Sequence, residues 1–254
     1  MNCSDFLWRL FESPLFDPFT ATLGFMIPIW VYTYQEIKLG CSSYRQWEDF
    51  MTLKGETKSI QFSFIAYWTG ILIWLHFVPR TKDQSHGIPT SLSSFSFLVG
   101  EVASGIILYD AIFFFIHWTM HECKLCDFVG SIHKEHHRLK KNLEAQHVLQ
   151  HSLIDGFLQV LVNIIVQQRT PFGLKSRFAR MLHNFIVTWM LTESHSSSPK
   201  PDIFRKWFVG CREHRRHHYM ETGDRYQQFF GYLDFYRNKW TCKEKAARAN
   251  EEIR

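Results

Sequence analysis

The sequence predicts an all-α protein, an integral membrane helical bundle, and two observations support that prediction. Five blocks of the 254-residue chain are rich in apolar side chains, and aromatic residues make up 17% of the whole. Two of these blocks carry no charge, and about 20 helical residues suffice to cross a hydrocarbon core of ~30 Å. The mean hydropathy of -0.18 resembles that of a soluble protein because polar segments separate the blocks. An apolar content of 46% excludes a disordered chain.

The first two blocks are the strongest candidates for membrane helices. Residues 18–35 and residues 59–79 contain no charged side chain, and the second block is long enough to span a bilayer. The first block is marginal in length, and Pro28 predicts a kink within it. The alternative for either block is the core helix of a soluble protein. Two uncharged aromatic stretches in so short a chain favour the membrane.

The three later blocks are shorter or carry charge. Residues 95–116 contain Glu101 and Asp110, which are costly in lipid unless they face protein or a cavity. Residues 152–168 and 178–192 are short for a span, so we expect tilted, re-entrant or buried helices there. Residues 194–201 are typical of a polar loop broken by proline, and the C-terminal tail is typical of a short solvated helix.

The distribution of positive charge predicts an orientation in the membrane. Lys and Arg gather after the third block, in HKEHHRLKK and from Arg205 onward, whereas the loop between the second and third blocks carries only Arg80 and Lys82. Positive charge prefers the cytosolic side, so the histidine-rich half is predicted to face the cytosol. The acidic N-terminus does not resemble a signal peptide, and six cysteines suggest no disulfide framework. A net charge of +5 does not by itself indicate nucleic-acid binding.

Histidine is the outlier of the composition, with 14 residues, of which 12 lie between His117 and His218. Ten of these form HxxxH at 117–121, HxxHH at 133–137, HxxxH at 147–151 and HxxHH at 214–218, while His183 and His195 stand alone. Residues three and four apart share a helix face, while an adjacent pair diverges by about 100°. Each HxxHH triplet can therefore supply two metal ions held side by side. By composition this pattern should occur about 0.04 times, yet it occurs twice, so we predict a histidine-rich di-metal site on the cytosolic side.

Ligand type leaves the metal open, because imidazole suits iron, zinc, copper and nickel. Acidic residues beside the clusters are candidate acceptors for the distal ring N–H of a ligand, with solvated surface charge as the alternative. We favour Glu193 and Asp110 in that role over Glu122, Glu135, Glu213 and Asp155.

Several other residues have ordinary interpretations. Cys123 and Cys126 form a single CxxC. We favour ordinary free thiols over a zinc-binding or redox-active pair as its interpretation. His147 pairs with His151 at helix spacing and stays open as a further ligand. The remaining assignments are core histidines (His76, His183), a loop histidine (His86), a basic cytosolic face (Arg215, Arg216), and helix packing with lipid contact (Phe113, Phe114, Phe115).

The order of the histidine motifs resembles the fatty acid hydroxylase/sterol desaturase superfamily, to which sterol C-4 methyl oxidase, sterol C-5 desaturase and the cholesterol side-chain hydroxylase belong. The likeness runs from about Asp110 to Arg237. Asp110 precedes His117 by seven residues, and His151 in HSLID follows the first HH pair by fourteen. LTESH at 191–195 and GDRYQQFFGYLDFY at 223–236 resemble further family stretches.

The resemblance implies a region of membrane helices at 1–94, a fatty acid hydroxylase-like catalytic region at 95–240 and a tail at 241–254. It implies two iron ions, with zinc possible in purified protein, and no catalytic residue beyond the metal ligands. The implied reaction hydroxylates or desaturates a sterol or fatty acyl chain with O₂ in the endoplasmic reticulum membrane, as a multi-pass protein. Electrons would come from NAD(P)H through cytochrome b5 and its reductase, which agrees with the lack of a nucleotide-binding glycine motif. The implied ligands are ten histidines: His117, His121, His133, His136, His137, His151, His195, His214, His217 and His218.

Three departures from the family pattern leave the subfamily, the substrate and the activity open. The first motif is HWTMH, with Trp118 where the family usually has arginine, and His195 is followed by SSS where the family has SGY. The stretch between His195 and His214 is also short. Three alternatives therefore stay beside the lipid oxygenase. These are a membrane acyl desaturase, a catalytically inactive metal-binding membrane protein of the same fold, and a metal transporter. A transporter would need histidines within its spans, whereas these gather just outside the apolar blocks.

Overall fold

In the part of the chain that the computed structural model describes, the protein consists of helices joined by loops and turns. That part comprises residues 9, 12, 13, 15–41, 65, 67–73, 87–122, 127–134, 136–138, 143–168, 175–198, 203–204, 207–220 and 225–252. No strand occurs among these residues, which confirms the predicted all-α fold. The second apolar block is described only at 65 and 67–73, where it is helical. His76, His86, Cys123, Cys126 and Glu135 lie outside the described residues.

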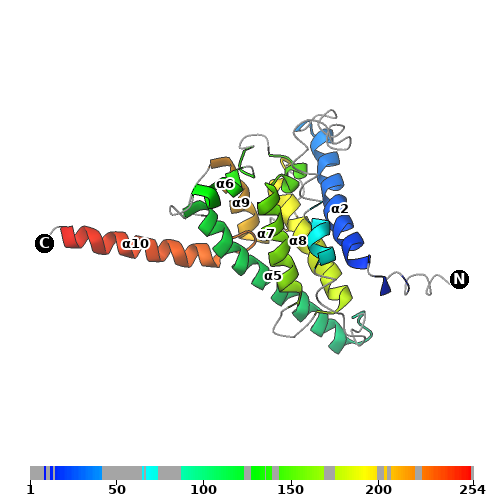
Figure 1. Ribbon diagram of the computed structural model, residues 1–254. Coiled ribbons are helices and arrows are strands. Elements are labelled where there is room, and N and C mark those ends of the chain that lie inside the picture. The colour runs from blue at the N-terminus through cyan, green and yellow to red at the C-terminus, as the bar shows by residue number, and fades with distance from the viewer. Residues whose placement is uncertain are drawn as a thin grey trace.

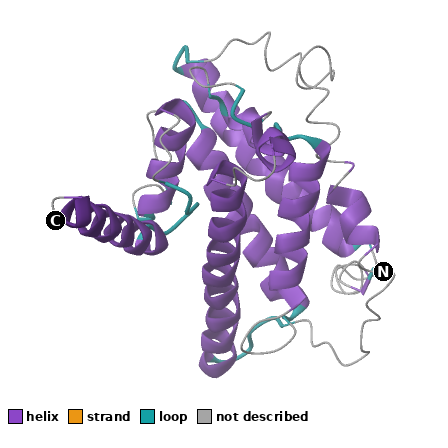
Figure 2. Cartoon of the chain, turned by 60° about the vertical axis from the view of Figure 1, so that its left-hand side comes forward, coloured by secondary structure: helices purple, strands orange, loops and turns teal. Residues whose placement is uncertain are grey.

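Four long helices form the body of the molecule: α2 (Phe16–Lys38), α5 (Leu92–Glu122), α7 (Leu153–Gln168) and α8 (Arg177–His195). Three shorter elements gather near one end of this bundle: α6 (Asp127–Lys134), the 3-10 helix η2 (Ala145–Leu149) and α9 (Val209–Met220) (Figure 1). The C-terminal helix α10 (Tyr232–Glu252) projects away from the bundle, as Figure 2 shows from a second side. Each of the first, third, fourth and fifth predicted blocks thus contains a helix.

The helices α2 and α8 approach closely where α2 carries a glycine. A Cβ atom at Gly24 would lie 3.2 Å from Thr188 Oγ1. The Thr188 hydroxyl of α8 donates a hydrogen bond to the Gly24 carbonyl of α2 at 2.6 Å, and this bond joins the two helices. Farther along, the Trp189 indole donates to the Tyr32 hydroxyl at 3.3 Å. α2 continues through Pro28, which lies buried inside it.

The acidic residues of the third block face protein, as their cost in lipid requires. Glu101 and Asp110 lie on α5 and are 3% and 0% exposed. Glu101 accepts hydrogen bonds from the Ser176 amide and hydroxyl, both at 3.1 Å. Ser176 in turn caps α8, because its hydroxyl accepts from the Ala179 amide. A buried carboxylate therefore fixes the beginning of α8 against α5.

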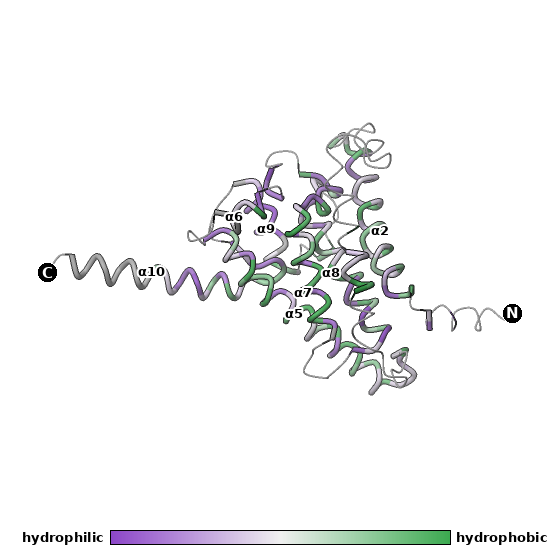
Figure 3. The backbone as a smooth tube through the Cα atoms, viewed as in Figure 1, coloured by the Kyte–Doolittle hydropathy of each residue, from purple (hydrophilic) through white to green (hydrophobic). Residues whose placement is uncertain are grey.

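One helix among the described residues, α5, is long and apolar enough to cross a membrane. Its exposed side chains include Phe95, Phe97 and Phe115. On α7, exposed apolar residues recur every four positions, at Leu153, Phe157, Leu161 and Ile165, and so form one face. Green bands in Figure 3 mark this apolar character along α5 and α7. The multi-pass topology and the cytosolic orientation stay predictions.

Candidate metal centre

Eight of the ten candidate histidines form two groups at the end of the bundle. Site 1 contains His117, His121, His133 and His137, and site 2 contains His136, His195, His214 and His218. Within each group the candidate ligand nitrogens all lie within 4.8 Å of one another. The first group joins α5 to α6 and the turn after it, and the second joins that turn to α8 and α9. The fold thus brings together histidines up to 101 positions apart (His117 to His218).

Each HxxHH triplet divides between the two sites, in agreement with the helical spacing. His133 and His137 belong to site 1 whereas His136 belongs to site 2. In the second triplet His214 and His218 belong to site 2, while His217 Nε2 lies 3.1 Å from His121 Nε2 of site 1. The sites adjoin where the His137 and His218 rings stack with centroids 4.3 Å apart. Their role as ligands stays a prediction, which this convergence supports.

Four rings have their tautomer determined by an acceptor on the Nδ1 side. His117 Nδ1 donates to the Tyr226 carbonyl at 2.8 Å, and His136 Nδ1 donates to the Gln150 carbonyl at 2.9 Å. His195 Nδ1 donates to the Leu191 carbonyl at 2.7 Å. His133 Nδ1 donates to Asp155 Oδ2 at 2.9 Å. A neutral imidazole with a proton on Nδ1 presents only a lone pair at Nε2.

The unprotonated Nε2 atoms of two of these rings face each other. The Nε2 atoms of His136 and His195 are 3.4 Å apart, and both rings carry their proton on the opposite side. Two lone pairs at this distance cannot form a hydrogen bond with each other. A bound cation would satisfy both, and neutral imidazole is the ligand form that transition metals take. The donor set of both sites therefore fits a metal ion.

Asp155 is the carboxylate that orients a candidate ligand, although the sequence favoured other acids. Its Oδ2 accepts from His133 and lies 3.5 Å from His151 Nδ1, and its Oδ1 accepts from Gln159 Nε2 at 3.1 Å. Asp155 is 1% exposed at the start of α7. His151 is a candidate ligand that belongs to neither group, and its ring stacks on that of His136 with centroids 4.4 Å apart. An acceptor of this kind holds a ligand ring in place and raises its basicity.

Asp110 and Glu193 both accept hydrogen bonds from backbone amides. Asp110 Oδ1 accepts from the Gln228 and Phe229 amides at 2.9 and 2.7 Å, so it holds the segment that follows Tyr226. That segment supplies the carbonyl to which His117 donates. Glu193 accepts from the Phe204 amide at 2.9 Å. The preference for Asp110 over Asp155 as a direct partner of a ligand was therefore wrong, because Asp110 acts through the backbone.

Burial keeps the imidazoles of site 2 neutral. Burial lowers the pKa of His136, and the neighbouring His151 and His133 lower it further. Burial likewise lowers the pKa of His214 and His218, again with help from adjacent imidazoles. For His195 burial lowers the pKa to about 3, against the opposing hydrogen bond to the Leu191 carbonyl. Neutral rings at physiological pH are ready to bind a cation without losing a proton.

We expect acid to destabilise the metal-free protein. The folded pKa of His195, about 3, lies below the ordinary value of 6.5, so the unfolded chain binds the proton more readily. The contribution of His195 to the free energy of unfolding is therefore fully present above about pH 7, and it is lost as the pH falls below 6.5. At pH 5 this one histidine would cost about 2 kcal/mol. Urea unfolding of chelator-treated protein at pH 8 and pH 5 measures the difference; equal free energies of unfolding would contradict it.

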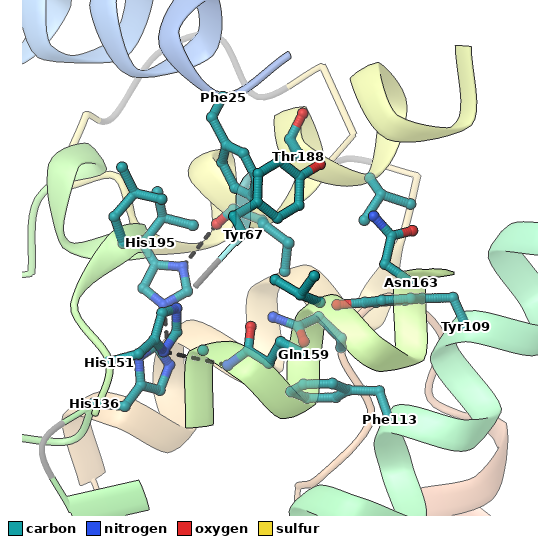
Figure 4. A pocket seen from close by; sticks show the side chains of 17 residues that line it. Phe25, Tyr67, Tyr109, Phe113, His136, His151, Gln159, Asn163, Thr188 and His195 are labelled. Atoms are coloured by element: carbon teal, nitrogen blue, oxygen red, sulfur yellow. Dashed lines mark hydrogen bonds between the residues drawn. The ribbon is translucent and has the colours of Figure 1, made fainter. Parts of the chain in front are cut away.

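A pocket opens onto site 2 and extends between the helices. Its lining includes His136, His151 and His195 at one side, which Figure 4 shows opposite Asn163 and Tyr109. The pocket holds about 680 Å³ of empty space, part of it open to solvent. Between the two sides its walls are mainly apolar and come from α2, α5, α7, α8 and η2. The apolar lining residues are Phe25, Phe113, Val148, Leu149, Val160, Val187 and Leu191. Concave, mostly apolar pockets with a few polar groups are typical of small-molecule sites.

Comparison with known proteins agrees with the histidine geometry. The family model described as fatty acid hydroxylase matches residues 102–238, more than half of the 254-residue chain. The chain belongs to the fatty acid hydroxylase family. The matched range contains both candidate sites and extends from within α5 to beyond the end of α9. The family is membrane-associated and typically iron-dependent. No curated protein and no solved structure matches the chain.

The side chains of Trp118 and Ser196, where the chain departs from the family pattern, lie away from the candidate ligand nitrogens. Trp118 is 39% exposed on the outer side of α5. Ser196, which follows His195, donates its hydroxyl to Glu36 Oε1 at 2.8 Å. Glu36 is fully buried near the end of α2 and also accepts from the Ser197 amide at 2.7 Å and the Ala145 amide at 3.1 Å. It therefore ties the segments beside His195 and ahead of His151 to α2.

Glu36→Ala is expected to lower the free energy of unfolding of the protein by about 3 kcal/mol, because two buried donors and one partly buried donor lose their acceptor. Metal content should fall with it, since the segment after His195 loosens. Glu36→Gln is the matched control: its amide oxygen can replace Oε1, which accepts all three bonds. Thermal unfolding and metal analysis measure both. Equal stability of Glu36→Ala and wild type would refute the role.

The structure also locates three further residues that the sequence singled out. His147 belongs to neither site, and its Nδ1 accepts from the Glu144 amide at 2.8 Å. His183 is a buried core histidine, as expected, with Nδ1 at 3.0 Å from Lys175 Nζ. Arg216 is exposed, in agreement with a basic surface.

Part of the pocket lining was not predicted from the sequence. Phe113 was assigned to packing and lipid contact, yet it lines the pocket. Tyr109 and Asn163 also line it and carried no motif. The four-residue step from Tyr109 to Phe113 to His117 along one face of α5 was the signal available, because it places both aromatic rings on the side of a candidate ligand.

Proposed function

We propose that this member of the family is a membrane-bound di-iron oxygenase that hydroxylates or desaturates a lipid, which is either a sterol or a fatty acyl chain. The observation that supports this most strongly is the pair of adjoining histidine sites with Nε2 lone pairs facing one another, beside an apolar pocket. Site 1, with His217, would hold one ion, and site 2, with His151, the other. Bound iron supplies the redox chemistry with O₂ that histidines cannot provide.

In this proposal the side chains and carbonyls of the protein orient the ligand rings and exclude water from the pocket. The carbonyls of Tyr226, Gln150 and Leu191 and the carboxylate of Asp155 hold the ligand rings in one orientation. The apolar walls exclude water and guide a hydrocarbon segment to the side of the pocket where His136, His151 and His195 lie. No acid–base side chain is required at the reacting carbon, so substrate position decides which C–H bond reacts.

Membrane insertion explains how such a substrate reaches the pocket. The exposed apolar faces of α5 and α7 would contact lipid, and the pocket lies between helices of the same bundle. In this proposal the protein is multi-pass in the endoplasmic reticulum, its histidine-rich half faces the cytosol, and electrons come from NAD(P)H through cytochrome b5 and its reductase. Protease accessibility of tags at the two termini and in residues 139–142 of intact microsomes tests the orientation.

The first test of the function is metal content together with product formation. Detergent-purified protein should contain about two transition-metal ions per chain, including iron. With cytochrome b5, its reductase, NADH and O₂, it should convert a sterol or fatty acyl lipid into a product that is heavier by one oxygen or lighter by two hydrogens. Full iron loading without oxidation of any lipid in a broad panel would favour an inactive family member. Protein that takes up no metal under anaerobic iron reconstitution would refute the proposal.

A further inference from the structure

The pocket is uncharged along its described lining. The residues that line it include histidines, tyrosines, glutamines, asparagine and threonine, but no Lys, Arg, Asp or Glu among the part of the chain that the structure describes. A buried anion without a cationic partner is strongly disfavoured. Away from the histidine side, where the proposed metal ion would lie, the described lining therefore fits a ligand whose buried portion is neutral.

Tyr67 presents an unused polar atom in this pocket. The residue is 6% exposed, its ring packs edge-on against Phe25 with centroids 5.4 Å apart, and its hydroxyl is buried without a hydrogen-bond partner. Figure 4 shows Tyr67 within the pocket with its hydroxyl on the side away from the histidines. Buried tyrosine hydroxyls normally find a partner, because an unsatisfied hydroxyl is costly. A ligand atom that can hydrogen-bond would supply that partner.

Asn163 adds a second polar group of determined orientation. Its Nδ2 donates to Asn184 Oδ1 at 2.8 Å, and its Oδ1 accepts from Gln167 Nε2 at 3.1 Å. These bonds hold the amide in place but leave one N–H and one lone pair for another partner. The Thr188 hydroxyl cannot donate to a ligand as well, because its one proton is already donated within the bundle to the Gly24 carbonyl.

We propose that the pocket binds a lipid through an uncharged hydroxyl or carbonyl oxygen at the end remote from the reacting carbon, and that the Tyr67 hydroxyl is the group that receives it. Asn163 lines the same side of the pocket and completes the polar end. This inference rests on the proposed function, since it assigns the side near His136 and His195 to the reacting carbon. A long-chain alcohol and a sterol share the required chemistry, so Tyr67 is a positioning and specificity-determining residue for either.

Binding of matched lipids tests the role of Tyr67 without requiring turnover. Metal-loaded protein in detergent micelles is titrated with 1-octadecanol, octadecane and octadecanoate, and separately with cholesterol and 5α-cholestane. Wild type should bind the alcohol of at least one pair about fivefold more tightly than its hydrocarbon. In Tyr67→Phe the alcohol should lose most of that advantage while hydrocarbon binding stays unchanged. Partition into micelles cancels, because the same ligands are compared between variants.

Two controls keep the outcome interpretable. Tyr34→Phe removes the hydroxyl of an exposed tyrosine on α2 outside the pocket lining and should bind every ligand as wild type does. Tyr67→Phe should fold normally, with an unchanged or higher melting temperature, because it removes an unpartnered hydroxyl. The pair of lipids that responds identifies the source of the hydroxyl.

Three results would overturn the inference: tightest binding of octadecanoate, equal weakening of alcohol and hydrocarbon in Tyr67→Phe, or no change in either. The proposed function fails separately, through absence of bound metal or of any oxidised lipid. If the protein oxidises a lipid but Tyr67→Phe leaves lipid binding unchanged, the proposed function stands and the role of Tyr67 is refuted.

Discussion

His136→Ala is expected to abolish lipid oxidation and to lower the metal content of the purified protein from about two ions per chain to one or none. His136 lies at the centre of site 2, with its ring centroid 4.4 Å from His151, 4.4 Å from His218 and 5.2 Å from His195. Its Nδ1 proton is held by the Gln150 carbonyl, so its Nε2 lone pair points at the proposed ion. Removing a ligand at the junction of the sites should therefore affect both. Elemental analysis and product formation measure the result.

Companion variants separate loss of a ligand from loss of the fold. His217→Ala removes the ring whose Nε2 lies 3.1 Å from His121 Nε2, and it should also abolish activity and lower metal content. His86→Ala should change neither, since His86 lies far in sequence from every cluster. Circular dichroism verifies that each variant keeps its helices. Full metal content in both His136→Ala and His217→Ala would refute the two-metal interpretation.

The histidine centre was more predictable than the rest of the molecule, because its geometry is local. Spacings of three and four on one helix determine which rings share a face, and the structure divides both HxxHH triplets accordingly. The first triplet shows a limit of that reasoning. α6 ends at Lys134, and His136 and His137 follow in a turn whose amides bond to the His133 carbonyl at 3.1 and 3.3 Å. A turn of nearly helical geometry preserves the same division.

The hydrogen-bond partners of the rings could not be predicted, because they depend on tertiary contacts. Asp155 stands 22 positions from His133, and no periodicity connects them. Asp110 stands seven positions before His117 on the same helix, so it looked closer to the chemistry, yet it holds the loop at 228–230. The carbonyls of Tyr226 and Gln150 are equally invisible in a sequence, since every residue has one. Sequence reasoning thus identified ligand candidates better than the groups that orient them.

The pocket was missed for a related reason. Its lining is assembled from α2, residue 67, α5, η2, α7, α8 and the 225–231 segment, each of which contributes only a few side chains. A single phenylalanine on an apolar helix contacts lipid, protein or a pocket with equal plausibility until the neighbouring helices are placed.

The buried acids of the third block were predictable in one respect. Their cost in lipid requires that they face protein, and Glu101 and Asp110 both do.

Asp155→Asn is expected to weaken metal binding by about 10- to 100-fold, the usual effect of removing a carboxylate that orients a ligand histidine. Its Oδ2 accepts from His133 of site 1 at 2.9 Å and lies 3.5 Å from His151 Nδ1, beside site 2. An amide is uncharged, and it cannot offer acceptors to His133 and Gln159 at once, because one of its two positions is a donor. Competition with a chelator of known affinity measures the change in both sites.

The matched control for Asp155→Asn is Glu213→Gln, which changes another acid beside a histidine motif. Glu213 precedes His214 on α9, but its carboxylate faces Arg225 at 3.4 Å and Arg216 at 3.9 Å. Such partly exposed ion pairs contribute little, so metal affinity should stay within about twofold of wild type. If Asp155→Asn lowered the melting temperature of the metal-free protein yet kept wild-type metal affinity, Asp155 would be a packing residue of α7. A loss of affinity that exceeds the loss of metal-free stability would instead show that one buried carboxylate orients ligands beside both sites.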